Sequence, residues 1–320
     1  MKAAVRETYG SVEVREIDKP VADDGGVLVR VHASSMNAAD WYAMMGRPYV
    51  ARVEMGLRTP KTNSIGTDFA GTVEAAGKDV TTFRPGDEVF GAKTGAYAEY
   101  VCVAEDRAVV TKPANVSFEQ AGAVGIAGVT ALQGLRDKAH VGPGQRVVIN
   151  GASGGVGTFA VQIAKALGAE VTGVCHTRNV ELVRSLGADH VVDYTREDFT
   201  RSDGRYDVLF DVAGNRSWSE CTRVLAPEAN VVIVGGPKSN ALLAPLGHVA
   251  RTRLASIVSS RKAAFFIAKF NKHDMEALRE LLASGEVTPA IEQEYPLSDI
   301  GAAFRHFGEG HARSKIVITV

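Results

Sequence analysis

The sequence predicts an α/β protein that combines a β-rich domain with a doubly wound parallel sheet. Residues 146–175 read as strand, glycine turn, helix and strand in succession. Strands and helices continue to alternate up to about residue 270, whereas residues 1–120 read as short strands separated by Gly and Pro. At 320 residues the chain is long enough for two domains.

The first 120 residues contain short segments with the apolar–polar alternation of half-buried strands. The segment 40–63 is less regular and predicts a helix followed by a long loop. Long loops in compact domains often carry function, so this segment is expected to shape a pocket. The predicted strands are 26–33, 69–75, 88–90, which follows the turn Pro85-Gly86-Asp87, and 96–103.

After residue 117 the pattern changes to helices alternating with strands, which indicates a parallel sheet. Residues 285–320 return to strand-like sequence and are expected to rejoin the first domain. The predicted domains are therefore 1–120 with 271–320, and 121–270. Between residues 117 and 285 the expected helices are 119–135, 156–167, 179–186 and 275–282. The expected strands of this part are 147–149, 170–175, 190–194, 206–212 and 230–235.

The glycine turn between the strand at 147–149 and the next helix resembles a dinucleotide fingerprint. Its glycines allow backbone N–H groups to approach a pyrophosphate, and the helix directs its positive end at the same phosphates. The match departs from G-x-G-x-x-G because Ala152 stands at the first glycine position, directly after Gly151. An ordinary glycine-rich turn is the alternative. The predicted cofactor-binding residues here are Ala152, Ser153, Gly154, Gly155, Val156 and Gly157.

The end of the second strand, at residue 175, predicts which cofactor binds. NAD-binding proteins usually carry Asp or Glu there to hold the ribose 2′-hydroxyl. This chain has Cys175, His176, Thr177 and Arg178 instead. A guanidinium and small polar groups suit a 2′-phosphate, so NADPH is predicted over NADH. The alternative is that Arg178 is a solvated residue at the start of a helix.

Composition excludes several classes of protein. The formal net charge is −1 at 45% hydrophobic and 23% charged residues, which indicates a globular protein without a nucleic-acid or membrane-surface field. Three scattered cysteines predict a reducing cytoplasm and no disulfide framework, and no Cys/His cluster has metal-site spacing. The N-terminal residues read as a strand and not as a secretory signal, and no apolar run is long enough to span a membrane.

Several long motifs together resemble the medium-chain dehydrogenase/reductase family, of the zinc-free quinone oxidoreductase type. The resemblance implies a GroES-like β-barrel catalytic domain formed by 1–120 and 271–320, a Rossmann domain at 121–270, and a homodimer. The motifs are GTDFAGTVEAAGKDVTTFRPGDEVFG at 66–91, GAYAEYV at 95–101, AVGIAGVTALQGL at 123–135, the glycine unit, LGADHVVDY at 186–194 and KIVITV at 315–320.

The zinc-dependent members of this family carry a metal-ligand Cys three residues before an Asp, and a His-Glu pair after a Gly. Here the Cys position is Asn37, the Asp is Asp40, and Thr67-Asp68 stands in place of His-Glu. The lobe that holds four zinc-binding cysteines is also missing. The resemblance therefore implies hydride transfer from NADPH to a quinone or an α,β-unsaturated carbonyl without a metal.

The reduced acceptor would carry negative charge and would need a hydrogen-bond donor and a proton. The resemblance implies Asn37 and Tyr42 as catalytic residues; the alternatives are a cap or turn residue for Asn37 and a core aromatic for Tyr42. Further cofactor-binding residues implied in the same way are Thr130, Tyr194, Gly235, Gly236 and Asn271.

Two other functions remain open at this point. The chain could be a zinc-independent alcohol or carbonyl oxidoreductase, which would need a Tyr or Ser acid that the sequence does not identify. It could also be a non-catalytic NADPH-binding protein with a structural or regulatory role. An intact fingerprint is required by all three functions and does not discriminate between them.

Overall fold

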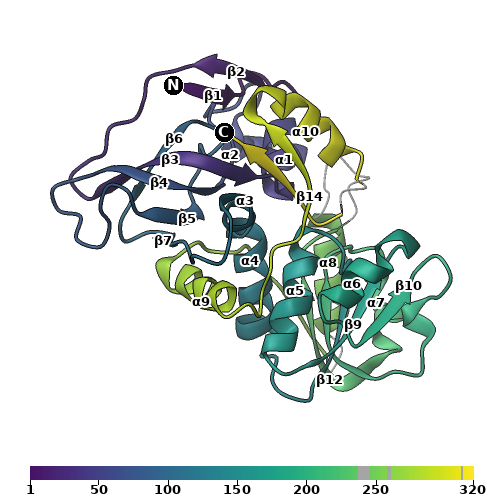
Figure 1. Ribbon diagram of the computed structural model, residues 1–320. Coiled ribbons are helices and arrows are strands. Elements are labelled where there is room, and N and C mark those ends of the chain that lie inside the picture. The colour runs from purple at the N-terminus through teal and green to yellow at the C-terminus, as the bar shows by residue number, and fades with distance from the viewer. Residues whose placement is uncertain (237–245, 258–260, 311–312) are drawn as a thin grey trace. The chain divides into compact units, whose positions relative to one another are not determined.

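The computed structural model describes residues 1–236, 246–257, 261–310 and 313–320 (Figure 1). These residues form two compact units. One consists of Met1–Val129 with Lys269–Val320, and the other of Thr130–Ala268. The sequence analysis expected the divisions after residues 120 and 270.

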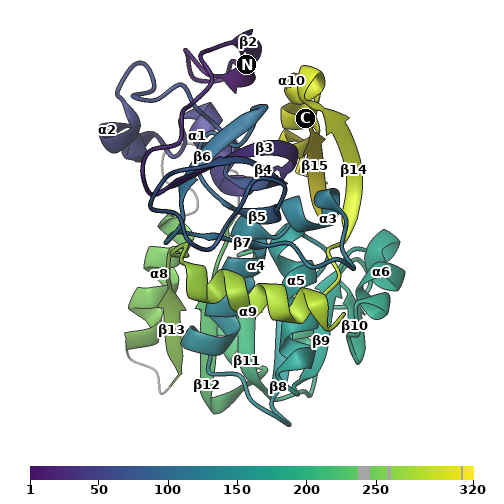
Figure 2. The ribbon, with the colours of Figure 1, turned by 60° about the vertical axis from the view of Figure 1, so that its left-hand side comes forward.

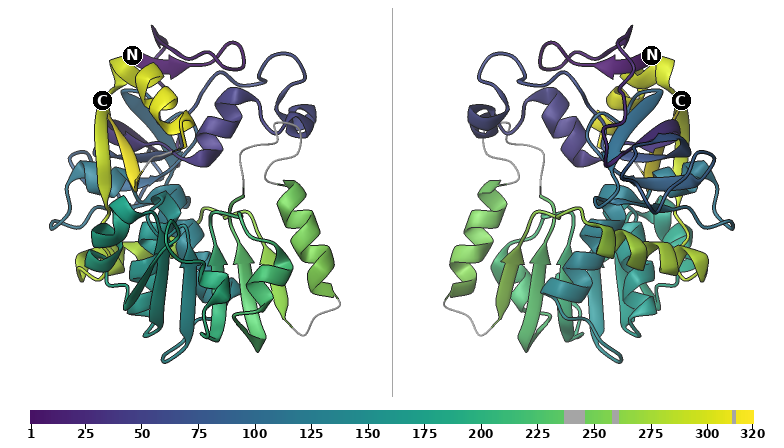
Figure 3. Two further views of the ribbon diagram at one scale, coloured as in Figure 1. Left: turned by 90° about the vertical axis from the view of Figure 1, so that its right-hand side faces the viewer. Right: turned by 90° about the vertical axis from the view of Figure 1, so that its left-hand side faces the viewer.

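The unit Thr130–Ala268 contains a parallel sheet with the strand order β10-β9-β8-β11-β12-β13. The chain starts at β8 in the middle, winds out to β10, returns to β11 and winds out the other way to β13. This is the predicted doubly wound sheet, and Figure 3 shows its strands side by side. Its strands are β8 (Arg146–Asn150), β9 (Glu170–Cys175), β10 (His190–Asp193), β11 (Tyr206–Asp211), β12 (Leu225–Ile233) and β13 (Lys262–Phe265).

Helices cover this sheet because its strands are apolar on both faces. Val148 and Leu209 of the central strands pack in one cluster with Cys221 of α7 and Val249 of α8. Phe159 and Ile163 lie on the buried face of α5, and each large apolar side chain that is fully buried contributes about 1.5–3 kcal/mol. The helices are α5 (Gly155–Ala166), α6 (Val180–Ser185), α7 (Trp218–Thr222) and α8 (Leu246–Ile257).

The glycine turn joins β8 to α5 and explains the departure from the fingerprint. Gly151 takes the left-handed φ of +94°, so Ala152 keeps a backbone conformation that L residues adopt. Gly157 is required for a different reason: a Cβ there would lie 2.1 Å from the carbonyl oxygen of Gly151. The turn therefore closes through backbone contact that only a glycine at position 157 permits.

The other unit contains a barrel-like sheet in the order β14-β15-β3-β4-β5-β7, in which β6 also pairs with β3. Its strand pairs are antiparallel except for β14 and β15, which run parallel. The C-terminal strand β15 lies beside β14 (Figure 2) and pairs antiparallel with β3, so both ends of the chain contribute to one sheet. A separate hairpin joins β1 and β2. The strands are β1 (Lys2–Val5), β2 (Glu13–Glu16), β3 (Gly26–Ser35), β4 (Asp68–Ala76), β5 (Glu88–Ala92), β6 (Tyr100–Ala104), β7 (Val109–Thr111), β14 (Ile291–Pro296) and β15 (Lys315–Thr319).

The two largest apolar clusters among the described residues of this unit stabilise it. One lies within the sheet and includes Val29, Phe69 and Val89. The other joins Trp41 of α1 to Phe304 of α10. The helices are α1 (Ala38–Met45), α2 (Arg52–Met55), α3 (Phe118–Gly122), α4 (Gly125–Leu132), whose last residues belong to the other unit, α9 (Lys272–Ala283) and α10 (Ile300–Gly308).

The structure differs from the sequence-based expectation in several elements. The tail, expected to be strand-like, contains α10, whose apolar residues Ile300, Ala303 and Phe304 recur at helical spacing and are buried. The expected strand 96–103 starts only at Tyr100, because residues 97–99 bond instead to β1. The expected helix 119–135 is interrupted between α3 and α4, and no element was expected where α8 and β13 lie.

Gly157→Ala is expected to destabilise the protein by about 1–3 kcal/mol, because the added methyl group overlaps the Gly151 carbonyl. Gly142→Ala is the matched control, since nothing lies within 4 Å of a Cβ at that position, and it should change stability by less than about 0.5 kcal/mol. Urea unfolding of both variants measures the difference. Equal stability of the two would contradict the proposed backbone contact.

Candidate functional site

Polar side chains that are almost fully buried gather where β3 ends and α1 begins. Asn37 and Asp40 are each 5% exposed, and Asp68, at the start of β4, is 0% exposed. The amide Nδ2 of Asn37 donates to Asp68 Oδ2 at 2.8 Å and to Asp40 Oδ2 at 3.2 Å. The backbone N–H of Asn37 also donates to Asp40, at 3.1 Å. Because buried carboxylates need donors, these contacts fix the start of α1.

Lys315 is the cation of this cluster. It lies at the start of β15 and is 1% exposed. Its Nζ donates to Asn37 Oδ1 at 2.6 Å and to the carbonyl oxygen of Met36 at 3.1 Å, and it lies 3.4 Å from Asp68 Oδ2. One ammonium therefore bonds the C-terminal strand to the link between β3 and α1 and to the first residue of β4. It also fixes the orientation of the Asn37 amide, whose oxygen faces Lys315 and whose nitrogen faces the carboxylates.

The carboxyl group of Asp40 is a weaker acid than that of an ordinary aspartate. Burial, followed by the nearby charge of Asp68, raises the pKa of Asp40 to about 6. The amide of Asn37 opposes this shift, followed by the hydroxyl of Thr67, which donates to Asp40 Oδ1 at 3.1 Å, and by the charge of Lys315. Burial also lowers the pKa of Lys315. The cluster thus holds two acids and one base away from water.

Tyr42 follows one turn into α1 and differs from the cluster. It is half-buried and packs against apolar residues, with its ring edge-on to Trp41 at 5.3 Å between centroids. Burial raises the pKa of its hydroxyl, so the group stays protonated. Among the described residues, no hydrogen-bond partner is found for that hydroxyl. Tyr42 therefore offers a donor, whereas the amide hydrogens of Asn37 already have acceptors within the protein.

In the other unit, the strand ends at β9 and β10 bring together the side chains expected to hold a 2′-phosphate. Thr177 and Arg178 are exposed, His176 is partly exposed, and Cys175 is buried, which raises the pKa of its thiol to about 11. A carboxylate that the sequence analysis missed is Asp193, which accepts from Thr177 Oγ1 at 2.6 Å.

The other residues implied by the resemblance have varied surroundings. Tyr194 is 49% exposed, with its ring edge-on to His176 at 5.6 Å. A Cβ at Gly235 would lie 2.0 Å from the carbonyl oxygen of Val212, so that loop needs glycine. Asn271 is the N-cap of α9, where its side chain accepts from the backbone N–H of Asp274. Thr130 is a partly exposed residue of α4.

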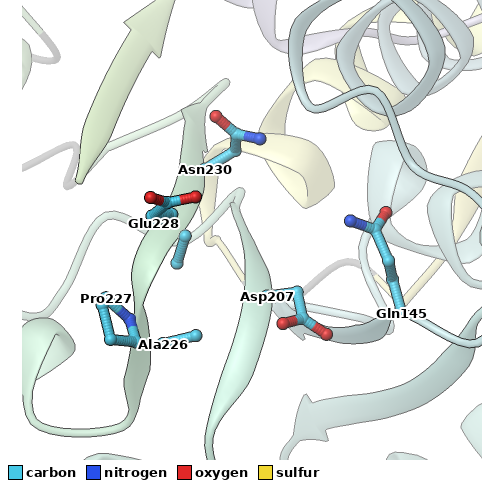
Figure 4. A pocket seen from close by; sticks show the side chains of 7 residues that line it. Gln145, Asp207, Ala226, Pro227, Glu228 and Asn230 are labelled. Carbon is cyan, nitrogen blue, oxygen red and sulfur yellow. The ribbon is translucent and has the colours of Figure 1, made fainter. Parts of the chain in front are cut away.

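A hollow of about 490 Å³ lies near the amino ends of β8 and β11, whereas the glycine turn follows the carboxyl end of β8; Figure 4 shows the side chains that line the hollow. Its polar side chains serve the fold: Asp207 accepts from the backbone N–H of Arg146 at 2.9 Å, and Asn230 donates to the carbonyl oxygen of Ala139 at 3.1 Å. It is therefore not the candidate site. Its lining is Gln145, Asp207, Ala226, Pro227, Glu228, Ala229 and Asn230.

Comparison with known proteins decides the family. Residues 23–114 match the alcohol dehydrogenase GroES-like domain, and residues 186–318 match the family described as zinc-binding dehydrogenase. The chloroplastic quinone oxidoreductase QR1 of Triphysaria versicolor is 32% identical over 99% of this chain and 98% of its own length. The chain belongs to the medium-chain dehydrogenase/reductase family.

Two further relatives agree with this membership. The chloroplastic NADPH-dependent alkenal/one oxidoreductase of Arabidopsis thaliana is 30% identical over 99% of this chain and 79% of its own length. The structure of the quinone oxidoreductase from Coxiella burnetii matches with a TM-score of 0.85 and 28% identity, over 100% of this chain and 99% of that one. The predicted combination of GroES-like and Rossmann domains is thus confirmed, and the chain is an oxidoreductase of this family.

Although one matching family is described as zinc-binding, the residues of this family member do not fit zinc. Asn37 Oδ1 already accepts from the Lys315 ammonium at 2.6 Å, and Thr67 is a poor zinc ligand. Within the described ranges, no group of three or more His, Cys, Asp or Glu side chains could hold a metal ion.

Membrane insertion, compartment and assembly were also considered in the sequence analysis. In the part of the chain that the structure describes, no helix is both long and apolar enough to cross a bilayer. The names of both plant relatives carry the word chloroplastic, so the expected cytoplasmic location of this chain stays a prediction. The homodimer likewise stays a prediction.

Sequence reasoning missed residues that only the fold brings together. The sequence predicted Lys315 only as the first residue of an apolar strand and Asp193 only as part of another strand. It assigned neither side chain to a site. For Lys315 the available signal is a single lysine followed by the apolar or small residues of a strand. For Asp193 it is a polar residue at the carboxyl end of a parallel strand. Asn150 and Asp211, each the last residue of a central strand, carry the second of these signals.

The contribution of Asp40 to the stability of this oxidoreductase is expected to fall as the pH rises from about 4 to about 6, so the wild type should lose stability relative to Asp40→Asn over that range. Asp40 has a folded-state pKa of about 6 against an ordinary 3.8, so the folded state binds its proton more tightly over that range. The loss reaches about 3 kcal/mol at about 1.4 kcal/mol per pKa unit. Asp40→Asn, whose amide nitrogen can face the Thr67 hydroxyl, should remove this dependence; urea unfolding at pH 4 to 7 measures it.

The matched control is Asp106→Asn, at an exposed carboxylate. It should leave the pH dependence of unfolding as in the wild type. A stability difference between wild type and Asp40→Asn that is the same at every pH would contradict the raised pKa of Asp40.

Proposed function

We propose that the chain reduces a quinone or an α,β-unsaturated carbonyl compound with a hydride from NADPH, without a metal. The observation that carries the proposal is the site at Asn37, where a lysine ammonium stands beside the residue that replaces a zinc ligand. The names of the relatives support the same class of acceptor, a quinone or an alkenal/one.

The residues around the glycine turn fit a dinucleotide. The first N–H groups of α5 have no acceptor inside the helix, and the turn is tight enough only because residues 151 and 157 are glycines. When bound, NADPH supplies the hydride. The part played by this chain is to hold the pyrophosphate at the N-terminus of α5 and the 2′-phosphate near Arg178.

Tyr42 is the residue proposed to assist the acceptor. Hydride addition leaves negative charge on an oxygen, and a protonated hydroxyl can donate a hydrogen bond or a proton to it. The hydroxyl of Tyr42 has its pKa raised by burial and no partner among the described residues. Asn37, whose amide bonds to Asp68, Asp40 and Lys315, would act by fixing the start of the helix that carries Tyr42.

The preference for NADPH is supported by the exposed guanidinium of Arg178 and the partly exposed ring of His176. Asp193 is a carboxylate close to this region and would oppose a phosphate. Its charge is largely engaged, because it accepts from the hydroxyls of Thr177 and Thr195 and lies 3.6 Å from Arg196 Nε. A net preference for the phosphorylated cofactor therefore remains the proposal.

The purified protein is expected to oxidise NADPH with at least one member of a panel of quinones, enals and enones, and at the same rate after treatment with a chelator. Tyr42→Phe should lower kcat by about 100-fold, the typical contribution of a positioned acid. Its matched control is Tyr49→Phe, which removes a hydroxyl from an exposed residue of the same segment. Tight NADPH binding without turnover of any acceptor would overturn the proposal and favour a non-catalytic role.

Arg178→Ala is expected to weaken binding of NADPH by about 1.5–3 kcal/mol, the contribution of a hydrogen bond to a charged group, and to leave NADH binding nearly unchanged. Arg184→Ala, at an exposed arginine of the following helix, is the control. Fluorescence titration with the two nucleotides measures both effects. Equal losses for NADPH and NADH would refute a role in binding the 2′-phosphate.

A further inference from the structure

The helix that carries Tyr42 is short, and Tyr42 stands near its end. α1 has 8 residues, which is little more than two turns, and Tyr42 belongs to the last turn. The last four carbonyl oxygens of an α-helix have no partner inside the helix, and unsupported helix ends fray. The orientation of the Tyr42 ring therefore depends on what holds the C-terminal end of α1.

Two of these four carbonyl oxygens are satisfied by the turn that follows the helix. The carbonyl oxygen of Tyr42 accepts from the backbone N–H of Arg47 at 2.9 Å. The carbonyl oxygen of Ala43 accepts from the backbone N–H of Gly46 at 3.1 Å. Gly46 takes a φ of +61°, the left-handed conformation in which many helices end. This part of the cap is local and needs no other segment.

The other two carbonyl oxygens accept from segments that lie elsewhere in the sequence. That of Met44 accepts at 2.9 Å from the backbone N–H of Gly10, between β1 and β2. That of Met45 accepts at 3.4 Å from Nη2 of Arg52, the first residue of α2, whose Nε also donates to the Gly46 carbonyl oxygen at 2.9 Å. Figure 2 shows α1 and α2 next to each other. A guanidinium here also suits the negative end of the helix dipole.

The guanidinium of Arg52 is itself held in place. Its Cζ lies 4.2 Å from the ring centroid of Tyr9 and 4.7 Å from that of Tyr49, so a cation is packed against two aromatic rings. The Tyr9 hydroxyl donates at 2.7 Å to the carbonyl oxygen of Gly56, where α2 ends. A Cβ at Gly46 would lie 2.5 Å from the Tyr9 ring and 2.8 Å from Arg52 Nε. This packing leaves the guanidinium little room to move.

We propose that Arg52 is a positioning residue for Tyr42, because its guanidinium holds the last turn of the helix that carries the proposed donor. The cluster around Asn37 holds the first turn, so polar groups from other segments fix α1 at both ends. This inference rests on the role given to Tyr42 in the proposed function. Arg52 acts through the helix and is assigned no contact with acceptor or cofactor.

Arg52→Met, which keeps an apolar stem and removes the charge and both donors, is expected to lower kcat about tenfold, because a less firmly held hydroxyl meets the acceptor in poorer geometry. The Kd for NADPH should stay within about twofold of the wild type, since the residues expected to bind it lie in the other unit. Arg52→Lys keeps a cation against the rings and one donor, and should restore kcat to within about threefold.

The matched control is Arg58→Met, at an exposed arginine of the same segment. Within the described ranges no hydrogen bond or ion pair is found for the Arg58 side chain, so kcat should not change. Loss of activity in Arg58→Met equal to that in Arg52→Met would point to the general charge of the segment and would rule out a specific role of Arg52.

A double-mutant cycle separates positioning of Tyr42 from a general structural role. In a Tyr42→Phe background the hydroxyl is already absent, so Arg52→Met should lower kcat by less than about twofold there. The same tenfold loss in both backgrounds, or no loss in the wild-type background, would disprove the inference. If Tyr42→Phe itself keeps full kcat, Tyr42 loses its role and the inference fails with it, whereas reduction of an acceptor by NADPH still stands.

Hydrogen exchange gives a readout that needs no turnover. The backbone N–H groups of Gly46 and Arg47 close the last turn of α1, and in Arg52→Met they should exchange about fivefold faster or more than in the wild type or in Arg58→Met. Unchanged exchange would show that Arg52 does not hold this turn and would also disprove the inference. Faster exchange in a protein that reduces no acceptor would count against the proposed function, although Arg52 would still hold the helix end.

Discussion

The unit built from both ends of the chain depends on one buried ammonium group. Lys315 Nζ bonds to Asn37 Oδ1 and the Met36 carbonyl oxygen and lies near Asp68, although Lys315 and Asp68 are 1% and 0% exposed. Removing one partner from such a pair leaves an uncompensated buried charge, which typically costs about 3–5 kcal/mol. The same contacts tie β15 to β3 and set the start of α1. The position of Tyr42 thus follows from a charge at the opposite end of the sequence.

The other unit is organised by backbone proximity and not by buried charge. Gly157 approaches the Gly151 carbonyl, Gly235 approaches the Val212 carbonyl, and Gly214 approaches Gly236. These contacts fix the loops at the carboxyl ends of the central strands, which is where open α/β sheets in general bind ligands. The side-chain amide of Asn150 adds hydrogen bonds between these loops, because it donates to Asp211 and Asn215. Rigidity of this kind suits a site that must hold a long, flexible dinucleotide, because less loop ordering is required on binding.

The residues at the positions of the family's zinc ligands form a different kind of polar cluster in this chain. A zinc site needs soft or imidazole ligands around an open coordination position. Here an ammonium that is covalently part of the chain donates to the Asn37 amide oxygen and the Met36 carbonyl oxygen and lies 3.4 Å from Asp68 Oδ2. This cation lies at the end of β3, and its hydrogen bonds are made within the protein. The chemistry proposed for this site is proton donation and hydrogen bonding by the hydroxyl of Tyr42.

The sequence by itself determined the fold class and the glycine turn, because hydrophobic periodicity and glycine spacing are local properties. Ala152 was readable as a tolerated departure, since Gly151 beside it can take the positive φ. The tertiary structure alone decided that Lys315 lies against Asn37, that Asp193 lies against Thr177, and that Asn150 orients Asn215. Each of these contacts joins residues from different strands, and their meeting depends on strand order and register, which no local pattern encodes. The buried charges and oriented amides were therefore visible only once the chain was folded.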